Sequence, residues 1–129
     1  MATLYSYTKQ SDQFTTYLPS APLDGSLTEL CTLDDGRTVV SVDGELPAQP
    51  VEVVLTELVL DDALRAEIKA KSPHVALINA RVVERIRAEY SQDDEIKALR
   101  IGGDYAAAWG EHVKVCRAWG DEQKEALGL

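Results

Sequence analysis

The chain has 129 residues, of which 45% are hydrophobic and 27% are charged. That length suits one domain, or one domain with an arm, and the balance is that of a globular protein rather than a disordered or collagen-like chain. No apolar run approaches the roughly 20 residues that a membrane helix needs. Because the first residues also lack the basic and apolar regions of a signal peptide, we expect a cytoplasmic protein.

Acidic residues outnumber basic ones by 22 to 13, which gives a formal net charge of −9. The imbalance lies in residues 1–60, which carry nine acids and only two bases. An acidic chain repels phosphate groups, so we expect neither nucleic acid nor an anionic membrane as a partner. The acidic first half either keeps the chain soluble or docks it onto a basic protein surface, and the sequence leaves both open.

The composition changes near residue 59. Residues 1–58 are rich in Thr, Val, Leu and Tyr, whereas residues 59–129 are rich in Ala, Arg, Glu and Lys. Strands followed by helices predict an α+β fold, with a small N-terminal antiparallel β-meander and a helical C-terminal half of three to four helices. The two regions form either one compact unit or two closely packed subdomains.

Turn residues separate the predicted strands. Strands over residues 27–33 and 38–42 form the clearest hairpin, because an Asp-Gly turn with Gly36 at positive φ suits a tight reversal. A third strand over residues 50–58 completes the meander. Residues 3–18 form either a further hairpin or an ordered arm that pairs with a partner.

Alternation along the hairpin predicts which side chains face the core. We expect Leu27, Cys31 and Leu33 to share one face of the first strand. Val40 and Val42 are expected to share one face of the return strand.

Four helices are predicted, each from a capping residue and an apolar stripe. The candidate N-caps are Asp61 or Asp62, Ser72, Ser91 and Asp104. The third helix carries Ile96 and Leu99 as its apolar residues and ends at Gly102 and Gly103. In the last helix, Gly110 and Gly120 each reduce stability by about 1 kcal/mol relative to Ala.

Two cysteines and one histidine are the first candidates for chemistry. His112 and Cys116 lie four residues apart on one helical face, a spacing that can chelate zinc, but a structural site needs about four ligands. Cys31 and Cys116 lie far apart and outside any C-x-x-C motif, so we expect two reduced, buried thiols. The sequence therefore predicts no metal site.

Charged clusters on the helices have structural explanations. Residues 93–95 are acidic but lack the spacing and the glycine of a calcium loop, and their charges suit the start of a helix. Arg81 and Arg85 share a helical face, where ion pairs with Glu84 and Glu89 of the same helix are expected. Contact with a phosphate or an acidic partner is the alternative for these arginines.

Catalytic motifs are missing from the sequence. No serine stands in a G-x-S-x-G elbow, and neither a G-x-G-x-x-G fingerprint nor a P-loop occurs. We therefore predict a non-enzymatic protein, with no catalytic residue and no cofactor.

Aromatic residues mark the last predicted helix. Trp109 and Trp119 are ten residues apart and point about 80° from one another on a helix. Either both close the core, or one of them contacts a partner, since aromatic residues are frequent at interface hot spots. The predicted partner-binding residues are Trp119, Arg117, Trp109 and Tyr105.

Four stretches of the chain carry a resemblance to a known kind of protein. They are residues 33–41, 72–79, 85–91 and 116–120. Spread loosely over residues 30–125, the pattern resembles small bacteriophage or prophage tail-region proteins, of the tail accessory and tail-fibre-assembly kind. The aromatic last helix is the part most similar to tail assembly proteins.

The resemblance implies a non-enzymatic protein that binds other phage tail or fibre proteins, either as a chaperone or as a part of the virion. It implies a location in the host cytoplasm or in the virion, and it assigns no functional residue. A generic bacterial adaptor unrelated to phage is the alternative, and a small hydrolase comes third. Self-association into a homo-oligomer is left open.

Overall fold

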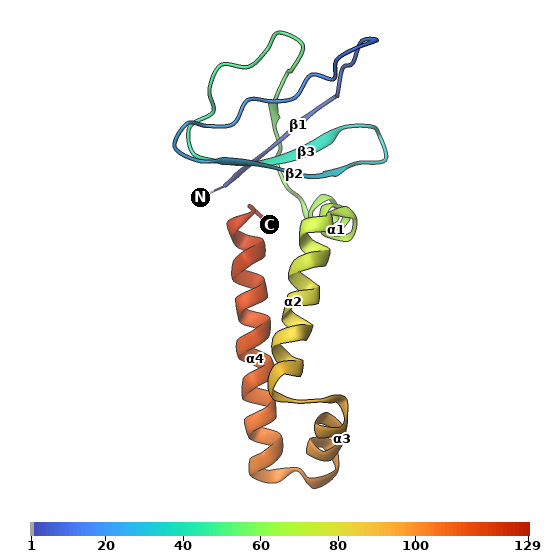
Figure 1. The fold of residues 1–129 in the computed structure, drawn as a ribbon, viewed down its shortest axis with the longest axis vertical. Coiled ribbons are helices and arrows are strands. Elements are labelled where there is room, and N and C mark those ends of the chain that lie inside the picture. Colours follow the sequence, from blue (N-terminus) through green and yellow to red (C-terminus); the bar gives the residue numbers. More distant parts are fainter. Residues whose placement is uncertain (1) are drawn as a thin grey trace. The chain divides into compact units, whose positions relative to one another are not determined.

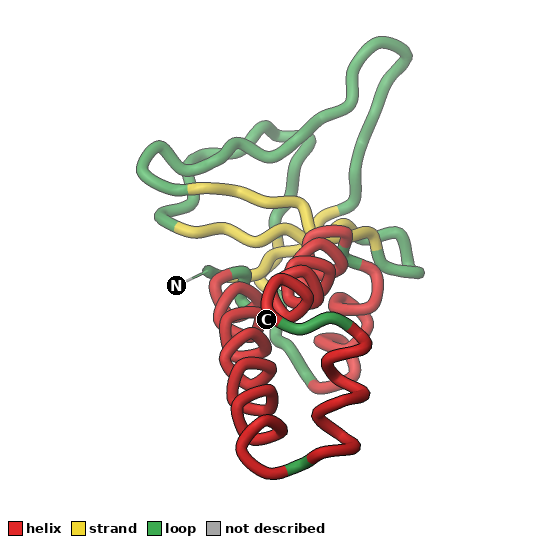
Figure 2. Tube along the Cα trace, turned by 60° about the horizontal axis from the view of Figure 1, so that its bottom comes forward, coloured by secondary structure: helices red, strands yellow, loops and turns green. Residues whose placement is uncertain are grey.

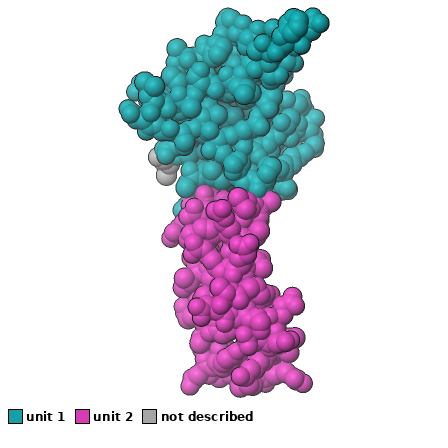
Figure 3. All heavy atoms as spheres, in the orientation of Figure 1, with its two compact units in different colours: residues 1–75, 125–129 teal, residues 76–124 magenta. Residues whose placement is uncertain are grey.

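The computed structural model describes residues 2–129, whose backbone forms two compact units. One unit contains the chain up to residue 75 together with residues 125–129, and the other contains residues 76–124 (Figure 3). All strands precede the first helix along the chain, so the predicted α+β class is confirmed.

The first unit contains a four-stranded antiparallel sheet in the order β2-β3-β1-β4. The strands are β1 (Thr3–Tyr7), β2 (Ser26–Thr32), β3 (Thr38–Asp43) and β4 (Thr56–Glu57) (Figure 1). β2 and β3 form the predicted hairpin, and Gly36 in its turn has a φ of +90°, as expected. Long loops connect the other strands (Figure 2).

The strand order corrects two predictions about the N-terminal segment and the meander. β1 lies between β3 and β4, so the sheet is not a simple meander, and residues 3–18 do not pair with themselves as two strands. The later part of that segment makes only the isolated bridge between Ser11 and Thr16. β3 explains this outcome, because a strand whose first five residues are all buried needs hydrogen-bonding partners on both edges.

The predicted third strand over residues 50–58 is shorter than expected. The backbone N–H of Val53 donates to the carbonyl of Pro50 at 3.0 Å, which forms a turn inside the expected strand. Within residues 50–58 the strand is reduced to Thr56 and Glu57, which pair with β1 rather than with β3, and the N–H of Leu58 donates to the carbonyl of Leu4 in β1 at 2.9 Å.

The two faces of the sheet carry separate hydrophobic clusters. The buried residues of the first cluster are Leu4, Leu30, Cys31, Leu33, Val39 and Ile68. Those of the second cluster are Tyr7, Val40, Val42 and Val53. Val40 and Val42 therefore share a face, as predicted, and β3 supplies side chains to both clusters.

A β-bulge in β2 explains why one prediction is wrong. The pairing of β2 with β3 shifts register between Glu29 and Cys31. An extra residue in a strand reverses the faces to which the following side chains point. Leu27 consequently packs with the second cluster, whereas Cys31 and Leu33 belong to the first, so the three do not share a face.

Four helices follow the sheet in the sequence, as predicted: α1 (Asp62–Lys71), α2 (Pro73–Glu89), α3 (Gln92–Ile101) and α4 (Gly103–Ala126). Asp61 caps α1 by accepting the backbone N–H of Leu64 at 2.7 Å. Ser72 precedes α2 and accepts the backbone N–H of Val75 at 3.4 Å. These contacts confirm that local polar residues mark the helix starts.

The other two helix starts give one confirmation and one correction. Ser91 caps α3 in a reciprocal capping box with Asp94. α4 begins at Gly103, so Asp104 lies inside its first turn instead of capping it. Gly102 has a positive φ of +65°, which ends α3 and lets the next helix start immediately.

Residues 125–129 complete the first unit. Leu127 and Leu129 pack against the cluster that contains Ile68. At Gly128, an added Cβ would lie only 3.2 Å from the carbonyl oxygen of Ala2. Segments from the two ends of the sequence therefore contribute to one core.

In the second unit, α2 and α4 run side by side in opposite directions and approach closely at Gly120 (Figure 1). A Cβ at this position would lie 2.6 Å from Val82 Cγ2. Gly120 is buried, whereas Gly110 on the same helix is exposed and has open space around it. Gly120 therefore permits the contact between the helices, besides reducing helix propensity.

We predict that Gly120→Ala lowers the free energy of unfolding by about 1 kcal/mol, although alanine favours a helix. The new methyl group would overlap a β-branched side chain that has one preferred rotamer in a helix, and such overpacking costs about 1–3 kcal/mol. The matched substitution Gly110→Ala is expected to stabilise the protein by about 0.5–1 kcal/mol through helix propensity alone. Urea unfolding of both variants measures the difference, and stabilisation by both substitutions would contradict the close approach.

A second prediction concerns the hairpin turn. Gly36→Val is expected to destabilise the protein by about 1 kcal/mol or more, because a β-branched side chain resists the positive φ of this residue. Open space surrounds Gly36, so the cost is backbone strain and not a clash. Gly36→Asn is the control, since asparagine tolerates positive φ better and should cost less. Equal melting curves for the wild type and Gly36→Val would show that the turn does not constrain the fold.

Candidate functional site

Aromatic side chains gather along the side of α4 that contacts the other helices of the second unit. The rings of Tyr105 and Tyr90 meet edge to face, with 6.1 Å between their centroids. The Arg85 guanidinium lies 3.8 Å from the centre of the Trp119 ring, and the Lys97 ammonium lies 4.8 Å from that of Tyr105. Contacts between cations and aromatic rings at such sites contribute about 0.5–1 kcal/mol each, so this cluster helps to hold the helices together.

The four predicted partner-binding residues lie in two kinds of environment. Tyr105, Trp109 and Trp119 are half-buried in the helix contact, and Arg117 is exposed. The indole nitrogen of Trp109 is itself buried. The three rings thus pack within the unit, and the proposed binding role of the four residues stays a prediction.

The structure brings His112 and Cys116 together, with 3.5 Å between Nε2 and Sγ. The same Nε2 lies 3.1 Å from the carbonyl oxygen of Arg85. Because a carbonyl only accepts, Nε2 carries the proton that it donates there, and a neutral imidazole then cannot take the thiol proton at the same atom. The arrangement is that of a packing contact and not of a nucleophile with its base.

Thiols and acids form no larger cluster around this pair. Cys31 and Cys116 are both buried and free, as predicted. Burial raises the pKa of the Cys31 thiol. Over residues 2–129, no three His, Cys, Asp or Glu side chains are placed to hold a metal ion.

Two arginines of α2, Arg85 and Arg87, contact other helices, and the ion pairs predicted within α2 are not formed. Arg87 pairs with Glu95 of α3 at 2.6 Å, and this hydrogen bond lowers the pKa of the Glu95 carboxyl. Arg85 covers Trp119 instead of pairing along its own helix. We expected ion pairs between Arg81 or Arg85 and Glu84 or Glu89. Within residues 2–129 the structure contains none of these pairs. For Arg85 and Arg87, contacts with neighbouring helices thus take the place of ion pairs within α2.

Sequence reasoning missed an exposed aromatic residue in the first unit. Phe14 is 89% exposed at the tip of a tight turn that spans residues 10–17, which we call the Phe14 turn. Asp12 holds this turn: one carboxylate oxygen accepts the backbone N–H groups of Phe14 and Thr15, each at 2.8 Å, and the other accepts the Tyr17 hydroxyl at 3.1 Å. Hydrogen bonding, first from Phe14, lowers the pKa of the Asp12 carboxyl.

Backbone contacts reinforce the same turn. The N–H of Tyr17 donates to the carbonyl of Gln10 at 2.9 Å, and the N–H of Asp12 donates to the carbonyl of Thr15 at 2.8 Å. The available sequence signal was Asp12, since an aspartate that precedes a turn commonly accepts backbone N–H groups two or three residues later. The turn therefore presents Phe14 on a fixed backbone.

A second surface that sequence reasoning missed lies on α3. Its apolar residues Ile96 and Leu99 are 54% and 75% exposed, whereas Ala98 is the buried residue of the helix. The small side chain of Ala98 faces inward, so the larger apolar side chains point to solvent. An exposed apolar pair of this kind adds to the surface available for contacts.

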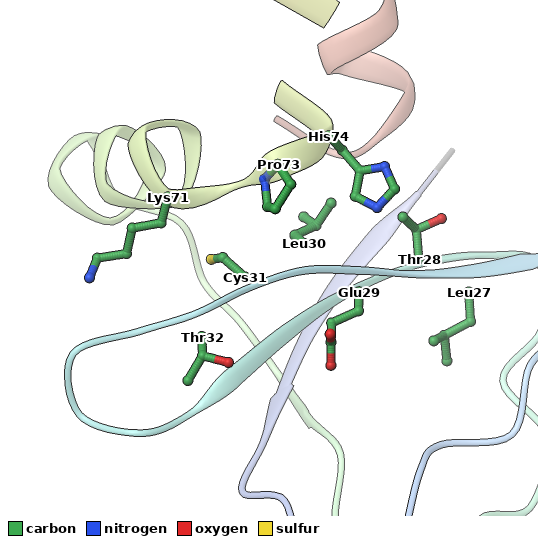
Figure 4. Close-up of a pocket in the computed structure, with 9 residues that line it drawn as sticks. All are labelled: Leu27, Thr28, Glu29, Leu30, Cys31, Thr32, Lys71, Pro73 and His74. Carbon is green, nitrogen blue, oxygen red and sulfur yellow. The ribbon is translucent and has the colours of Figure 1, made fainter. Parts of the chain in front are cut away.

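An open groove of about 650 Å³ runs along β2 in the first unit (Figure 4). Residues 27–32 line it from the strand, and Lys71, Pro73 and His74 line it from the junction between α1 and α2. β2 forms one edge of the sheet, so the groove borders a strand that has a neighbour on one side only.

Comparison with known proteins gives no assignment: no family model, curated protein or solved structure matches this chain. Among the described residues, no helix has the length and apolar character needed to cross a membrane.

We predict that Trp119→Ala lowers the free energy of unfolding by about 1–2 kcal/mol. The substitution removes a half-buried ring and its contact with Arg85, and a fully buried tryptophan would cost about 3–5 kcal/mol. Arg117→Ala is the control on the same helix, since an exposed side chain should change stability by less than about 0.5 kcal/mol. Chemical unfolding followed by circular dichroism measures both. Unchanged stability of Trp119→Ala would favour a role for this ring outside the fold.

Proposed function

We propose that this protein acts by binding other proteins, without catalysis, in the structure or assembly of a phage tail. The Phe14 turn is the observation that carries the binding proposal. The tail context rests on the sequence resemblance to tail accessory and tail-fibre-assembly proteins. On this proposal the protein acts in the host cytoplasm, as a chaperone, or as part of the virion.

The Phe14 turn has the physical properties of a binding anchor. Transfer of a phenylalanine side chain from water to an apolar socket is favourable by about 1.5–3 kcal/mol. The backbone that carries Phe14 is already fixed by hydrogen bonds, so binding would order few additional groups. Central aromatic residues of this kind dominate the binding energy of many interfaces.

Charge defines the kind of surface that would receive Phe14. The first unit carries thirteen acidic and five basic residues, a net charge of −8, whereas the second unit carries nine and eight. Complementary charge increases both association rate and specificity. The expected partner surface is therefore an apolar socket surrounded by basic side chains.

Two alternatives differ in their support. A bacterial adaptor unrelated to phage would use the same exposed surfaces, and the neighbouring genes distinguish the two: tail-fibre or baseplate genes favour the phage proposal, and a metabolic operon favours the adaptor. A hydrolase has less support, because the imidazole next to the buried Cys116 thiol is hydrogen-bonded to a backbone carbonyl.

The test uses the proteins encoded beside this gene, each purified and titrated against the full chain by calorimetry. We expect one of them to bind, and Phe14→Ala to weaken that binding at least tenfold, which corresponds to about 1.4 kcal/mol. The melting temperature of the variant should not change, because the side chain makes few contacts within the protein.

Two further variants make this test specific. Val51→Ala removes another exposed apolar side chain of the same unit, 88% exposed, and should bind normally. Asp12→Ala keeps Phe14 but loses the hydrogen bonds of the turn, and should bind more weakly than the wild type. If no neighbouring protein binds, or if Phe14→Ala binds as tightly as Val51→Ala, the proposal fails.

A further inference from the structure

α3 joins α2 to α4 and turns its large apolar side chains to solvent (Figure 1). Ala98 is the residue that this helix buries. Ile96, Leu99 and Ile101 are instead 54%, 75% and 63% exposed. A helix on the surface of a protein normally buries its large apolar side chains, so this reversed arrangement leaves an apolar face that residues 2–129 do not cover.

Two charges on α3 are also unused within the chain. Three of its five charged side chains have contacts of their own in the second unit: Asp94, Glu95 and Lys97. Asp93 and Arg100 are exposed, and within residues 2–129 neither has an ion-pair or hydrogen-bond partner. These two charges are therefore free to interact with a second molecule.

Asp93 and Arg100 lie at the two ends of one stripe on the exposed face. They are seven residues apart, which is almost two turns, so they share a face and lie about 10 Å from each other along the helix. Ile96 lies between them, three residues after the acid and four before the base. A groove of about 430 Å³ follows the same stripe and is lined by Asp93, Ile96, Lys97, Arg100 and Ile101.

This stripe is complementary to itself. The midpoint between Asp93 and Arg100 lies between residues 96 and 97. If two copies of α3 pair in opposite directions about that midpoint, each Asp93 lies level with Arg100 of the second copy, and the two Ile96 side chains lie between the ion pairs. A parallel pairing would instead set acid against acid and base against base. A symmetric contact uses the same patch on both copies, and this patch meets that requirement.

The symmetry of the stripe selects a second copy over an unrelated partner. A different protein could complement one acid or one base, but it would not require both at equal distances from the centre of the helix. The second unit carries nine acidic and eight basic residues, so its net charge does not oppose self-association as that of the first unit would. Lys97 lies next to the midpoint, but its ammonium lies 4.8 Å from the centre of the Tyr105 ring, so this side chain reaches toward α4 of its own chain.

We propose that the exposed face of α3 binds the same face of a second copy of this chain, in the opposite direction, to form a weak symmetric dimer. A helix of ten residues is about 15 Å long, and a contact of that length buries well under the roughly 1,200 Å² below which complexes are transient. We therefore expect dimers at chain concentrations of about 0.1–1 mM. This surface is separate from the Phe14 turn and does not rest on the tail context, so the failure of one proposal leaves the other standing.

Sedimentation equilibrium of the full chain at low salt measures the association, and charge reversal tests its geometry. Asp93→Lys sets two bases against each other at both ends of the contact, and Arg100→Glu sets two acids against each other. Each variant alone should dimerise about fivefold or more weakly than the wild type, because one substitution changes both ion pairs. Dilution of the wild type should shift the amide magnetic resonance signals of residues 92–101.

Two combinations should restore the dimer. In an equimolar mixture of Asp93→Lys and Arg100→Glu chains, every acid again faces a base, so association should return to within about twofold of the wild type. Both variants keep a net negative charge, so a general attraction between the chains would not explain the recovery. The double variant with both substitutions should also dimerise, since exchanging acid and base preserves an antiparallel contact but not a parallel one.

Matched controls use exposed residues of α4. Glu111→Lys makes the same charge change as Asp93→Lys and should leave the dimer unchanged. Ile96→Ala should weaken the dimer about threefold or more, whereas Val115→Ala, at a residue that is 62% exposed, should not. Circular dichroism checks that each variant folds, and Asp93→Asn replaces Asp93→Lys if the latter does not, with a smaller loss expected.

Several results would overturn the proposal. These are a chain that stays monomeric up to about 1 mM, equal weakening by Asp93→Lys and Glu111→Lys, or a mixture of the two charge variants that fails to recover. Dimerisation with signal shifts confined to residues outside 92–101 would place the contact elsewhere and would also overturn it.

Discussion

The structure of the first unit depends on the complete burial of β3. Its first five residues are buried, and they supply side chains to clusters on both faces of the sheet. A buried strand needs hydrogen-bonding partners along both edges and apolar cover on both faces. β2 and β1 meet the first need, and α1 together with loop residues such as Val53 meets the second.

Local signals allowed most element boundaries to be predicted. Asp61, Ser91 and Gly36 act through hydrogen bonds and backbone angles within a few residues of themselves, and each has the predicted role. The partners of β1 and the bulge in β2 were not predictable in this way. Both are set by packing between segments that are distant in the sequence, and a register shift of one residue leaves no periodic signature.

The candidate surfaces also divide into features that the local sequence predicts and features that depend on packing between distant segments. The aromatic face of α4 follows from helical spacing, and the sequence did bring Tyr105 and Trp119 to attention. Whether those rings pack inward depends on Arg85 and Tyr90, which the spacing along α4 does not reveal. Phe14 and the open edge of β2 were missed because exposure is a property of the assembled fold: an isolated phenylalanine between polar residues is equally compatible with a buried position.

The packing of residues 125–129 in the first unit has a consequence for biosynthesis. Leu127 and Leu129 are translated after all four strands and all four helices, and they cover the cluster that includes Leu4 and Ile68. The strands therefore emerge from the exit tunnel before this part of their apolar cover exists, and the core can close completely only after residues 125–129 have also emerged. A nascent chain with that delay exposes hydrophobic surface and an open strand edge together, which are the features that chaperones recognise.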